Sequence, residues 1–290
     1  MKLIIESGAT KSDWTLILND GEISSFKMAG LNFSSGNDEF LSRTLEEASL
    51  QVVQSLGASA PDSIQIDEIH FYAAGLFPSE DPDSPFQRLA TMLGNHFPGS
   101  AIRLESDLLA AARALFGHEP GIVCILGTGS NVCIYDGTSI TSRVNSGGFI
   151  LGDEGSASAL GRAFISDYLK DLVPETVTRY FQEKHDMSYP EIVRNVYRGT
   201  SPSAYLGAFA KDILSFYATE HYMQNLVDEN FRLFFARCLA RFKAENLPVG
   251  IAGSFGYACR EIIAALGEQD GFRISKFVAS PSEGLIAYHK

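Results

Sequence analysis

A hairpin whose tip consists of glycine and small hydroxyl residues constrains this chain more than any other feature. An apolar strand at residues 122–126 leads into the tip at residues 127–131, GTGSN, and a second apolar strand follows at residues 132–135. Because glycine has no side chain to block an approaching ligand, the N–H groups and hydroxyls of such a tip can bind an anion. The sequence therefore predicts two paired strands that present an anion-binding loop.

The N-terminal part of the chain repeats this plan. Strands are expected at residues 3–5 and 14–18, and a hairpin turn at Asn19-Asp20-Gly21 leads to a third strand at residues 22–28. The loop between the first two strands, residues 6–13, lacks the spacing of a Walker loop and does not open a helix as a dinucleotide-binding motif does. Two halves with one pattern predict a duplicated, two-lobed α/β architecture, a class that binds ligands between its lobes.

Hydrophobic periodicity predicts helices and strands for the rest of the chain. Helices are expected at residues 37–56, 84–96, 107–116, 156–171, 174–184, 188–197, 202–219, 222–245, 257–266 and 282–289. Strands are expected at residues 66–74, 101–104, 249–252 and 273–278, with a turn at residues 253–256. Alternating elements of this kind are typical of an α/β protein.

Composition excludes several classes of function. The chain has 290 residues, enough for two domains, and a formal net charge of −12. Binders of nucleic acids or anionic membranes need a basic face, so neither partner is expected. No window approaches about eighteen apolar residues and the start is too polar for a signal peptide, so we expect a cytoplasmic protein. Cys124, Cys133, Cys238 and Cys259 form no CxxC pair and are expected to be core residues in a reducing compartment.

Asp107 stands where a predicted strand ends and a predicted helix begins. Ser106 or Asp107 can cap this helix by accepting hydrogen bonds from its free N–H groups. A carboxylate at the end of a strand can also take a proton from a substrate hydroxyl, and one aspartate can serve both roles. The local sequence leaves both interpretations open.

Three further polar turns are candidates for ligand binding. Asp153 and Glu154 lie between glycines ahead of a predicted helix, where they can cap the helix or bind sugar hydroxyls. Asn32 follows a strand, either as an Asx turn or as a ligand contact. The turn at residues 253–256 is either a plain connection or a nucleotide site at a helix N-terminus. The six histidines lack metal-ligand spacing, and no nucleophile elbow with a Ser/His/Asp arrangement is found.

The ordered set of motifs resembles the sugar-kinase branch of the actin/hexokinase/Hsp70 superfamily. The specific resemblance is to the N-acetylglucosamine kinases within the BadF/BadG/BcrA/BcrD ATPase family. The segments that carry it are Glu6–Lys11 and Leu126–Asn131 (the two phosphate motifs), Ser106–Ala111 (the connecting motif with its aspartate), Gly147–Ser156 (the sugar loop) and Val249–Ser254 (the adenosine motif). They occur in the family's order and span nearly the whole chain.

The resemblance implies an ATP-dependent sugar kinase with two RNase H-like lobes that close over ATP, Mg²⁺ and the sugar. It places the lobes at residues 1–107 and 108–290, with the last helix packing back on the N-terminal lobe. Asp107 would be the catalytic base that activates the sugar 6-hydroxyl, and Glu6 would hold Mg²⁺ through water. The implied nucleotide-binding residues are Gly8, Thr10, Lys11, Gly127, Thr128, Gly129, Gly207, Gly253 and Ser254. The implied sugar-binding residues are Asn32, Gly75, Asp107, Asn131, Gly147, Gly148 and Asp153.

One departure from the family's pattern lies in the first loop. Ser7 and Ala9 stand where most members carry glycine, and their side chains narrow the space through which a phosphate reaches this loop.

Other functions fit the same resemblance. The substrate implied is N-acetylglucosamine or a close amino sugar, and a glucosamine kinase is the nearest alternative. A redox-activating ATPase of the family would need cysteines for an iron–sulfur cluster, and the four cysteines here are scattered. A non-catalytic sugar or nucleotide sensor would not need a base at position 107. A homodimer is compatible with any of these.

Overall fold

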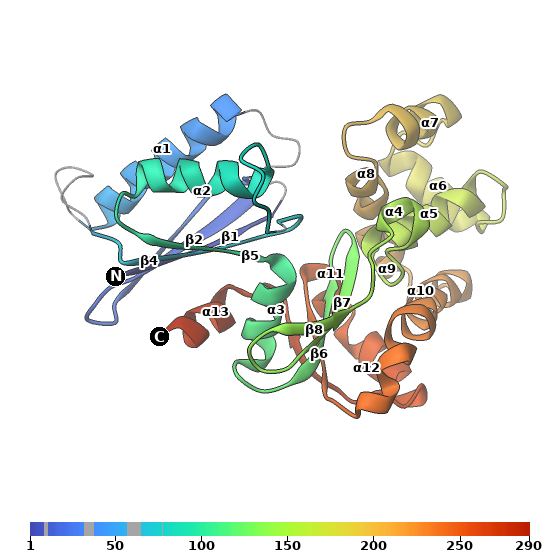
Figure 1. The fold of residues 1–290 in the computed structure, drawn as a ribbon. Helices are drawn as coiled ribbons and strands as arrows, with labels where there is room; N and C mark the ends of the chain where they lie inside the picture. The colour runs from blue at the N-terminus through green and yellow to red at the C-terminus, as the bar shows by residue number, and fades with distance from the viewer. Residues whose placement is uncertain (9–10, 32–37, 57–64, 77) are drawn as a thin grey trace. The chain divides into compact units, whose positions relative to one another are not determined.

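The computed structural model describes the chain except residues 9–10, 32–37, 57–64 and 77. The chain divides into two compact units (Figure 1). Unit 1 comprises Met1–Gly117 together with Pro281–Lys290, and unit 2 comprises His118–Ser280.

Unit 1 is built on a five-stranded sheet in the order β3-β2-β1-β4-β5. The strands are β1 (Lys2–Ser7), β2 (Lys11–Ile17), β3 (Ile23–Ala29), β4 (Glu68–Ala73) and β5 (Ala101–Ser106). The first three strands form an antiparallel meander, and β4 and β5 continue the sheet parallel to β1. Parallel strands need crossover connections, and these are supplied by helices.

Both faces of the unit 1 sheet are covered by helices (Figure 1). The helices are α1 (Asp38–Ser55), α2 (Pro85–His96), α3 (Asp107–Phe116) and α13 (Ser282–His289). Because successive side chains of a strand point to opposite faces, Leu3 and Ile5 pack in the core with α1 and α2, whereas Ile4 packs with Ala110 of α3 and Leu285 of α13. Because helices cover both faces of the sheet, β1 and β4 are buried along most of their length.

The sheet of unit 2 has the same plan. Its order is β10-β9-β6-β7-β8, with an antiparallel meander from β6 to β8 and with β9 and β10 added in parallel. The strands are β6 (Gly121–Leu126), β7 (Ser130–Tyr135), β8 (Ile140–Arg143), β9 (Val249–Ala252) and β10 (Ile274–Val278). The α/β class and the two matching sheets expected from the sequence are confirmed.

Unit 2 carries a larger set of helices around a core rich in phenylalanine. The helical segments are α4 (Gly148–Leu151), α5 (Ala157–Tyr168), α6 (Glu175–Lys184), α7 (Tyr189–Arg198), α8 (Pro202–Ala208), α9 (Ala210–Ser215), α10 (His221–Phe234), the π-helical turn η2 (Phe235–Leu239), the 3₁₀ segment η3 (Ala240–Glu245), α11 (Ser254–Ala258) and α12 (Arg260–Gln269). Phe164, Phe181, Phe231, Phe234 and Phe235 are almost completely buried among them. All four cysteines are buried and free, as the sequence predicted.

Several predicted elements of unit 2 differ from the structure. Residues 202–219 form two short helices instead of one, with the break at Phe209, two residues after Gly207, a poor helix former. The expected helix at residues 222–245 changes at Phe235 to a π-helical turn and then to 3₁₀ geometry. The expected turn at residues 253–256 is confined to Gly253, because α11 begins at Ser254. Helix α4 has too few residues to show a period in the sequence.

Helices α3 and α13 both belong to unit 1. The sequence analysis began the second lobe at residue 108 and so placed α3 there, but it expected the last helix to pack back on the N-terminal lobe. Gly284 of α13 packs so closely on Ala114 of α3 that a Cβ at position 284 would overlap the backbone of Ala114. The His289 Nε2 atom lies 2.8 Å from the hydroxyl of Tyr72 on β4, and Lys2 Nζ donates to the carbonyl oxygen of His289 at 2.7 Å. These contacts hold the end of the chain against α3 and the sheet of unit 1.

Candidate functional site

The glycine loop between β6 and β7 is held by the start of helix α5. The N–H of Ala157 donates to the carbonyl of Gly127 at 3.0 Å, and the N–H of Ser158 donates to the carbonyl of Thr128 at 3.0 Å. Within the loop, the N–H of Gly127 donates to the carbonyl of Gly129 at 3.0 Å. The loop is therefore a fixed turn, with the Thr128 side chain exposed to solvent.

Two glycines expected at the nucleotide lie beside this loop. A Cβ built on Gly207 would lie 3.6 Å from Thr128 Cγ2, so the end of α8 contacts the loop. Gly253 has a φ of 117°, and a Cβ there would overlap the carbonyl oxygen of Leu126. Because β6 and β9 are parallel neighbours, with Ile125 opposite Ala252, their carboxyl ends share one edge of the sheet. The structure thus brings together the nucleotide-binding candidates of unit 2, which are Gly127, Thr128, Gly129, Gly207, Gly253 and Ser254.

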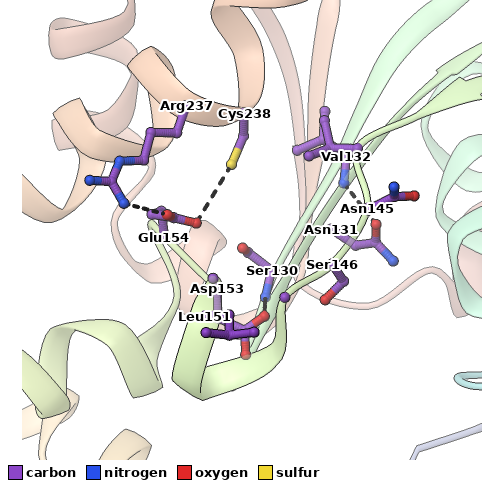
Figure 2. Close-up of a pocket in the computed structure, with 13 residues that line it drawn as sticks. Ser130, Asn131, Val132, Asn145, Ser146, Leu151, Asp153, Glu154, Arg237 and Cys238 are labelled. Atoms are coloured by element: carbon purple, nitrogen blue, oxygen red, sulfur yellow. Dashed lines mark hydrogen bonds and ion pairs between the residues drawn. The ribbon is translucent and has the colours of Figure 1, made fainter.

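A pocket with a volume of about 200 Å³ opens beside the loop (Figure 2). Asn131, Gly147 and Asp153, all expected at the sugar, are among its lining residues. Four further lining residues, Ser130, Leu151, Gly152 and Glu154, belong to segments that the sequence analysis had linked to ligands. The sequence analysis did not link the remaining ones to a ligand, and these are Val132, Val144, Asn145, Ser146, Arg237 and Cys238. Asn145 and Ser146 precede the glycine pair at 147–148, a signal that was available in the sequence. Arg237 and Cys238 come from a distant helix and have no local signal.

Asp153 is the buried carboxylate of this pocket. Its backbone is left-handed, with a φ of 58°, an uncommon conformation for a residue with a side chain. Oδ1 accepts a hydrogen bond from the N–H of Ser130 at 3.2 Å, and the carboxylate packs so closely on Gly129 that a Cβ there would lie 3.0 Å from Oδ2. Burial raises the pKa of Asp153, opposed by the Ser130 N–H and by the charge of Arg162. Asp153 therefore joins the pocket to the glycine loop.

The capping role considered for Asp153 and Glu154 belongs to another residue. The N-cap of α5 is Ser156, whose hydroxyl accepts a hydrogen bond from the N–H of Ala159 at 3.1 Å. Glu154 instead forms an ion pair with Arg237, with 3.0 Å between Oε1 and Nη1. Neither carboxylate is therefore the cap of α5, and Figure 2 shows both beside the pocket.

The other rim of the pocket is a tight turn closed by two glycines. A Cβ on Gly147 would lie 2.9 Å from the nitrogen of Gly152, so the two backbones pack directly on each other. Gly148 opens α4 with a φ of 62°. Arg162 of α5 donates hydrogen bonds to the carbonyls of Phe149 and Ile150, which fixes α4 against α5. A side chain at 147 would open this turn.

In unit 1 the candidate residues follow the carboxyl ends of parallel strands. Ser7 of β1 is paired with Ala73 of β4, and Ala73 with Ser106 of β5, so the residues after these strands lie along one edge of the sheet. The candidates there are Glu6, Gly8, Lys11, Gly75 and Asp107. The N–H of Gly8 donates to the carbonyl of Lys11 at 2.9 Å, which closes the β1–β2 hairpin. Thr10 and Asn32 lie outside the described residues, and their roles stay predictions.

Asp107 is the first residue of α3, and the cap of this helix is Ser106. The Ser106 hydroxyl accepts a hydrogen bond from the N–H of Leu109 at 3.2 Å, while Asp107 Oδ1 accepts one from the N–H of Leu108 at 2.8 Å. Burial raises the pKa of Asp107, and the Leu108 N–H partly offsets this effect. The end of α3 is thus capped by Ser106 and by one oxygen of Asp107, Oδ1. The second carboxylate oxygen of Asp107 is not needed for this cap.

The described residues suit a magnesium ion that arrives with a nucleotide. Nowhere in the described parts do three His, Cys, Asp or Glu side chains gather as a metal site. Mg²⁺ at a nucleotide needs only one or two carboxylates, because phosphates and water complete its octahedron. Glu6, at the end of β1, fits this requirement.

Among the helices described, none is long and apolar enough to cross a membrane.

Comparisons with known proteins identify the family. No protein-family model and no curated protein matches the chain. A solved structure from Porphyromonas gingivalis, provisionally named an N-acetylglucosamine kinase, is 34% identical with a TM-score of 0.88, covering 100% of this chain and 98% of that chain. A protein of the same provisional name from Chromobacterium violaceum is 19% identical with a TM-score of 0.77, covering 100% and 98%.

A more distant structure has the same fold. It is a ROK-family glucokinase from Streptomyces griseus, solved with glucose and AMPPNP, and it is 17% identical with a TM-score of 0.52, covering 99% of this chain and 97% of that chain. At 17% identity this likeness shows a shared fold, whereas the 34% identical Porphyromonas gingivalis protein shows the family. The chain therefore belongs to the N-acetylglucosamine kinase family of the actin-like sugar kinases, which are ATP-dependent phosphotransferases.

Proposed function

We propose that this protein transfers the γ-phosphoryl group of ATP to O6 of N-acetylglucosamine. The observation that carries the proposal is the contact between Asp153 and Gly129, which joins a pocket lined by polar groups to a glycine loop suited to phosphates. The name of the Porphyromonas gingivalis relative supports the choice of sugar. Phosphoryl transfer depends mainly on positioning and on neutralising charge, and a site of this kind supplies both.

Asp107 is proposed as the general base. A carboxylate with a raised pKa holds a proton better than an exposed aspartate, which favours removal of a proton from a hydroxyl as the phosphoryl group is transferred. Its hydrogen bond from the Leu108 N–H fixes the carboxylate at the end of β5. The Ser106 hydroxyl accepts the Leu109 N–H, so α3 keeps this cap whatever Asp107 does, and the role of base is proposed for Asp107.

The nucleotide is proposed to bind through backbone groups. Gly127, Thr128 and Gly129 would hold phosphates, with Gly207, Gly253 and Ser254 nearer the adenosine, and Gly8, Thr10 and Lys11 of unit 1 would contribute further phosphate contacts. When bound, Mg²⁺ supplies positive charge that neutralises the phosphate oxygens. Glu6 is proposed to hold the ion through a water molecule.

The sugar is proposed to be oriented by hydrogen bonds within the pocket of unit 2. Asp153 is an acceptor fixed by Ser130, and Asn131 offers an amide whose oxygen also accepts from the N–H of Val132 at 3.0 Å. Gly147 lines the pocket, whereas Gly148 begins α4 and is not a lining residue; both are proposed to present backbone groups to the sugar. Convergent polar groups of fixed orientation discriminate between polyols, because a wrong hydroxyl leaves one of them unpaired.

The test is release of ADP from Mg²⁺·ATP with a panel of sugars. The panel contains N-acetylglucosamine, glucosamine, N-acetylmannosamine, N-acetylmuramic acid and glucose, and the position of the new phosphate is read by NMR. A strong preference for N-acetylglucosamine, with the phosphate on O6, is the expected result. A preference for glucosamine would make glucosamine, and not N-acetylglucosamine, the substrate. ATP binding without sugar-stimulated turnover would favour a non-catalytic sensor.

A further inference from the structure

The loop that carries Asp153 has little internal support. Gly152 and Gly155 flank the two acids, and both Asp153 and Gly155 have positive φ angles, of 58° and 78°. Glycine adds conformational freedom, and a left-handed aspartate costs of order 1 kcal/mol or more unless its surroundings hold it. The position of the Asp153 carboxylate therefore depends on contacts from outside the loop.

One side of these contacts comes from helix α10. Asn230 is 7% exposed, and its Oδ1 accepts from the N–H of Gly155 at 3.3 Å while its Nδ2 donates to the carbonyl of Ser156 at 3.3 Å. A Cβ on Gly155 would lie 2.7 Å from Phe234, so the loop packs directly on this helix. Both backbone groups around Gly155 are thus fixed by residues about 75 positions later in the chain.

Besides Ser130 and Gly129, which contact Asp153 itself, the π-helical turn η2 supplies contacts to Glu154. Arg237 Nη1 lies 3.0 Å from Glu154 Oε1, and Cys238 Sγ lies 4.0 Å from Glu154 Oε2. Figure 2 shows the Glu154 carboxylate between these two side chains and Asp153 beside Ser130. A π-helical turn adds a residue to the helix and so shifts the side chains that follow; such turns are frequent at functional sites.

We propose that Arg237 and Asn230 are positioning residues for Asp153 and thereby set the affinity for the sugar. The inference rests on the proposed function, because it assigns Asp153 to sugar binding. The side chain of Glu154 is 15% exposed, so loss of Arg237 leaves a poorly hydrated carboxylate whose remaining partner is a thiol. Without Arg237, the Glu154 carboxylate gains hydration by moving toward water, and the adjacent residue Asp153 moves with it.

The main variant is Arg237→Gln, compared with Arg237→Lys. Gln removes the charge and Lys keeps it without the planar guanidinium group. The matched control is Arg241→Gln, because Arg241 lies on the same helical run, has its guanidinium 4.9 Å from the ring centre of Phe242, and is not a lining residue of the pocket. Arg237→Gln is expected to raise the KM for the sugar about five- to tenfold with the KM for ATP unchanged. Arg237→Lys should recover part of this loss.

Asn230 gives a second and separate test of the same idea. Asn230→Asp keeps the Oδ1 acceptor for Gly155 and removes the Nδ2 donor to Ser156. The same rise in the sugar KM, without a rise in the ATP KM, is expected. A variant in which both KM values rise together would indicate general damage to unit 2 and would count against a positioning role.

Hydrogen exchange of the free protein distinguishes this inference from the proposed function. Arg237→Gln is expected to speed exchange of the amides at residues 153–156 relative to Arg241→Gln, and this measurement needs no sugar. Unchanged exchange, or a sugar KM within twofold of the wild type, would overturn the positioning role. Wild-type protein without sugar-stimulated ADP release would instead contradict the proposed function, while the exchange comparison would still decide whether Arg237 holds the loop.

Discussion

The two units share one sheet plan and differ in what is built around it. Each sheet has an antiparallel meander of three strands, extended by two strands parallel to the first. In unit 1 helix α1 lies between β3 and β4, whereas in unit 2 the segments from α4 to η3 lie between β8 and β9. Unit 2 therefore surrounds the same sheet with a much larger helical core.

The hairpin loops show the consequence for function. The Gly8 loop is closed locally, by the hydrogen bond from its own N–H to Lys11. The Gly127–Gly129 loop is fixed by Ala157 and Ser158 from α5 and is packed against by Asp153. The extra helices of unit 2 thus fix its hairpin loop beside the pocket, whereas in unit 1 the candidate carboxylate, Asp107, lies where β5 ends and α3 begins.

The largest effect is expected at the catalytic candidate of unit 1. Asp107→Asn keeps the size and hydrogen-bonding capacity of the side chain but removes the base, so kcat should fall by about 10²–10⁴-fold. Steady-state ADP release measures this change, and circular dichroism checks the fold. Asp83→Asn, on an exposed loop of the same unit, is the matched control. Near-normal turnover of Asp107→Asn would move the base to another residue.

The same carboxylate sets the direction of the pH profile. Because burial raises the pKa of Asp107, protonation removes the base at a pH above the ordinary range of aspartate. We expect kcat to fall as pH decreases through this raised pKa and to be constant above it. In Asp107→Asn the residual activity should lack this acid limb; an identical limb in both proteins would assign it to another group.

The helical layers of the two units should respond in opposite ways to one substitution. A Cβ on Gly161 of α5 would overlap the carbonyl oxygen of Leu206, so Gly161→Ala forces α5 and α8 apart and should destabilise unit 2 by about 2–3 kcal/mol. A Cβ on Gly94 of α2 would lie at an ordinary 3.9 Å from Ile102, so Gly94→Ala should stabilise unit 1 by about 0.5–1 kcal/mol.

Urea unfolding can separate these two effects. Trp14 is the one tryptophan of the chain and is fully buried in unit 1, so its fluorescence reports that unit. Circular dichroism at helical wavelengths reports chiefly the helix-rich unit 2. Equal shifts of both signals for Gly161→Ala would mean that the units unfold together.

Acid should weaken unit 1 through the two histidines at the base of α13. The rings of His70 and His289 lie 4.0 Å apart, and burial lowers the pKa of both, that of His289 to about 3. In the folded protein His289 stays neutral down to about pH 3, and the lowered pKa of His70 acts in the same direction, whereas an unfolded histidine binds a proton below about pH 6.5. The unfolded state therefore binds more protons between these pH values, and stability falls as pH decreases, by about 1.4 kcal/mol per pH unit for His289 alone.

His289→Gln tests this acid sensitivity. Glutamine can still hydrogen-bond the hydroxyl of Tyr72 but cannot titrate. The free energy of unfolding, followed by Trp14 fluorescence from pH 7 to pH 5, should depend less on pH in the variant. Equal slopes for the two proteins would show that other groups cause the acid sensitivity of unit 1.

The smallest effect compares the two hairpin loops directly. Gly129→Ala places a Cβ 3.0 Å from the Asp153 carboxylate, which must shift, and a loss of about 1 kcal/mol corresponds to about a fivefold rise in the sugar KM. Gly8→Ala places its Cβ at 3.5 Å from the Lys11 carbonyl, which is ordinary contact, and should leave the sugar KM unchanged. A rise of the sugar KM in both variants would mean that the two hairpin loops affect sugar binding in the same way.

Local patterns predicted much of the fold. The Gly/Thr tip between two apolar strands and the turn at Asn19-Asp20-Gly21 identified both meanders, because alternation and turn chemistry act over a few residues. The strand-to-helix junction at Asp107 was also visible, although the sequence could not assign the cap to Ser106. The α-helix expected at residues 222–245 ends before Phe235, where the chain adopts π-helical geometry. Packing rather than helix propensity sets the geometry there.

By itself, then, the sequence determined the paired meanders, the glycine loops and the position of Asp107 at a strand end, because each depends on neighbours in the chain. The tertiary structure alone decided that Gly207 lies beside Thr128, that Gly129 packs against the Asp153 carboxylate, and that Arg237 reaches Glu154. These contacts join residues that are tens of positions apart. They depend on how helices pack around the sheet, and hydrophobic periodicity indicates which face of a helix is buried but not which residue it meets.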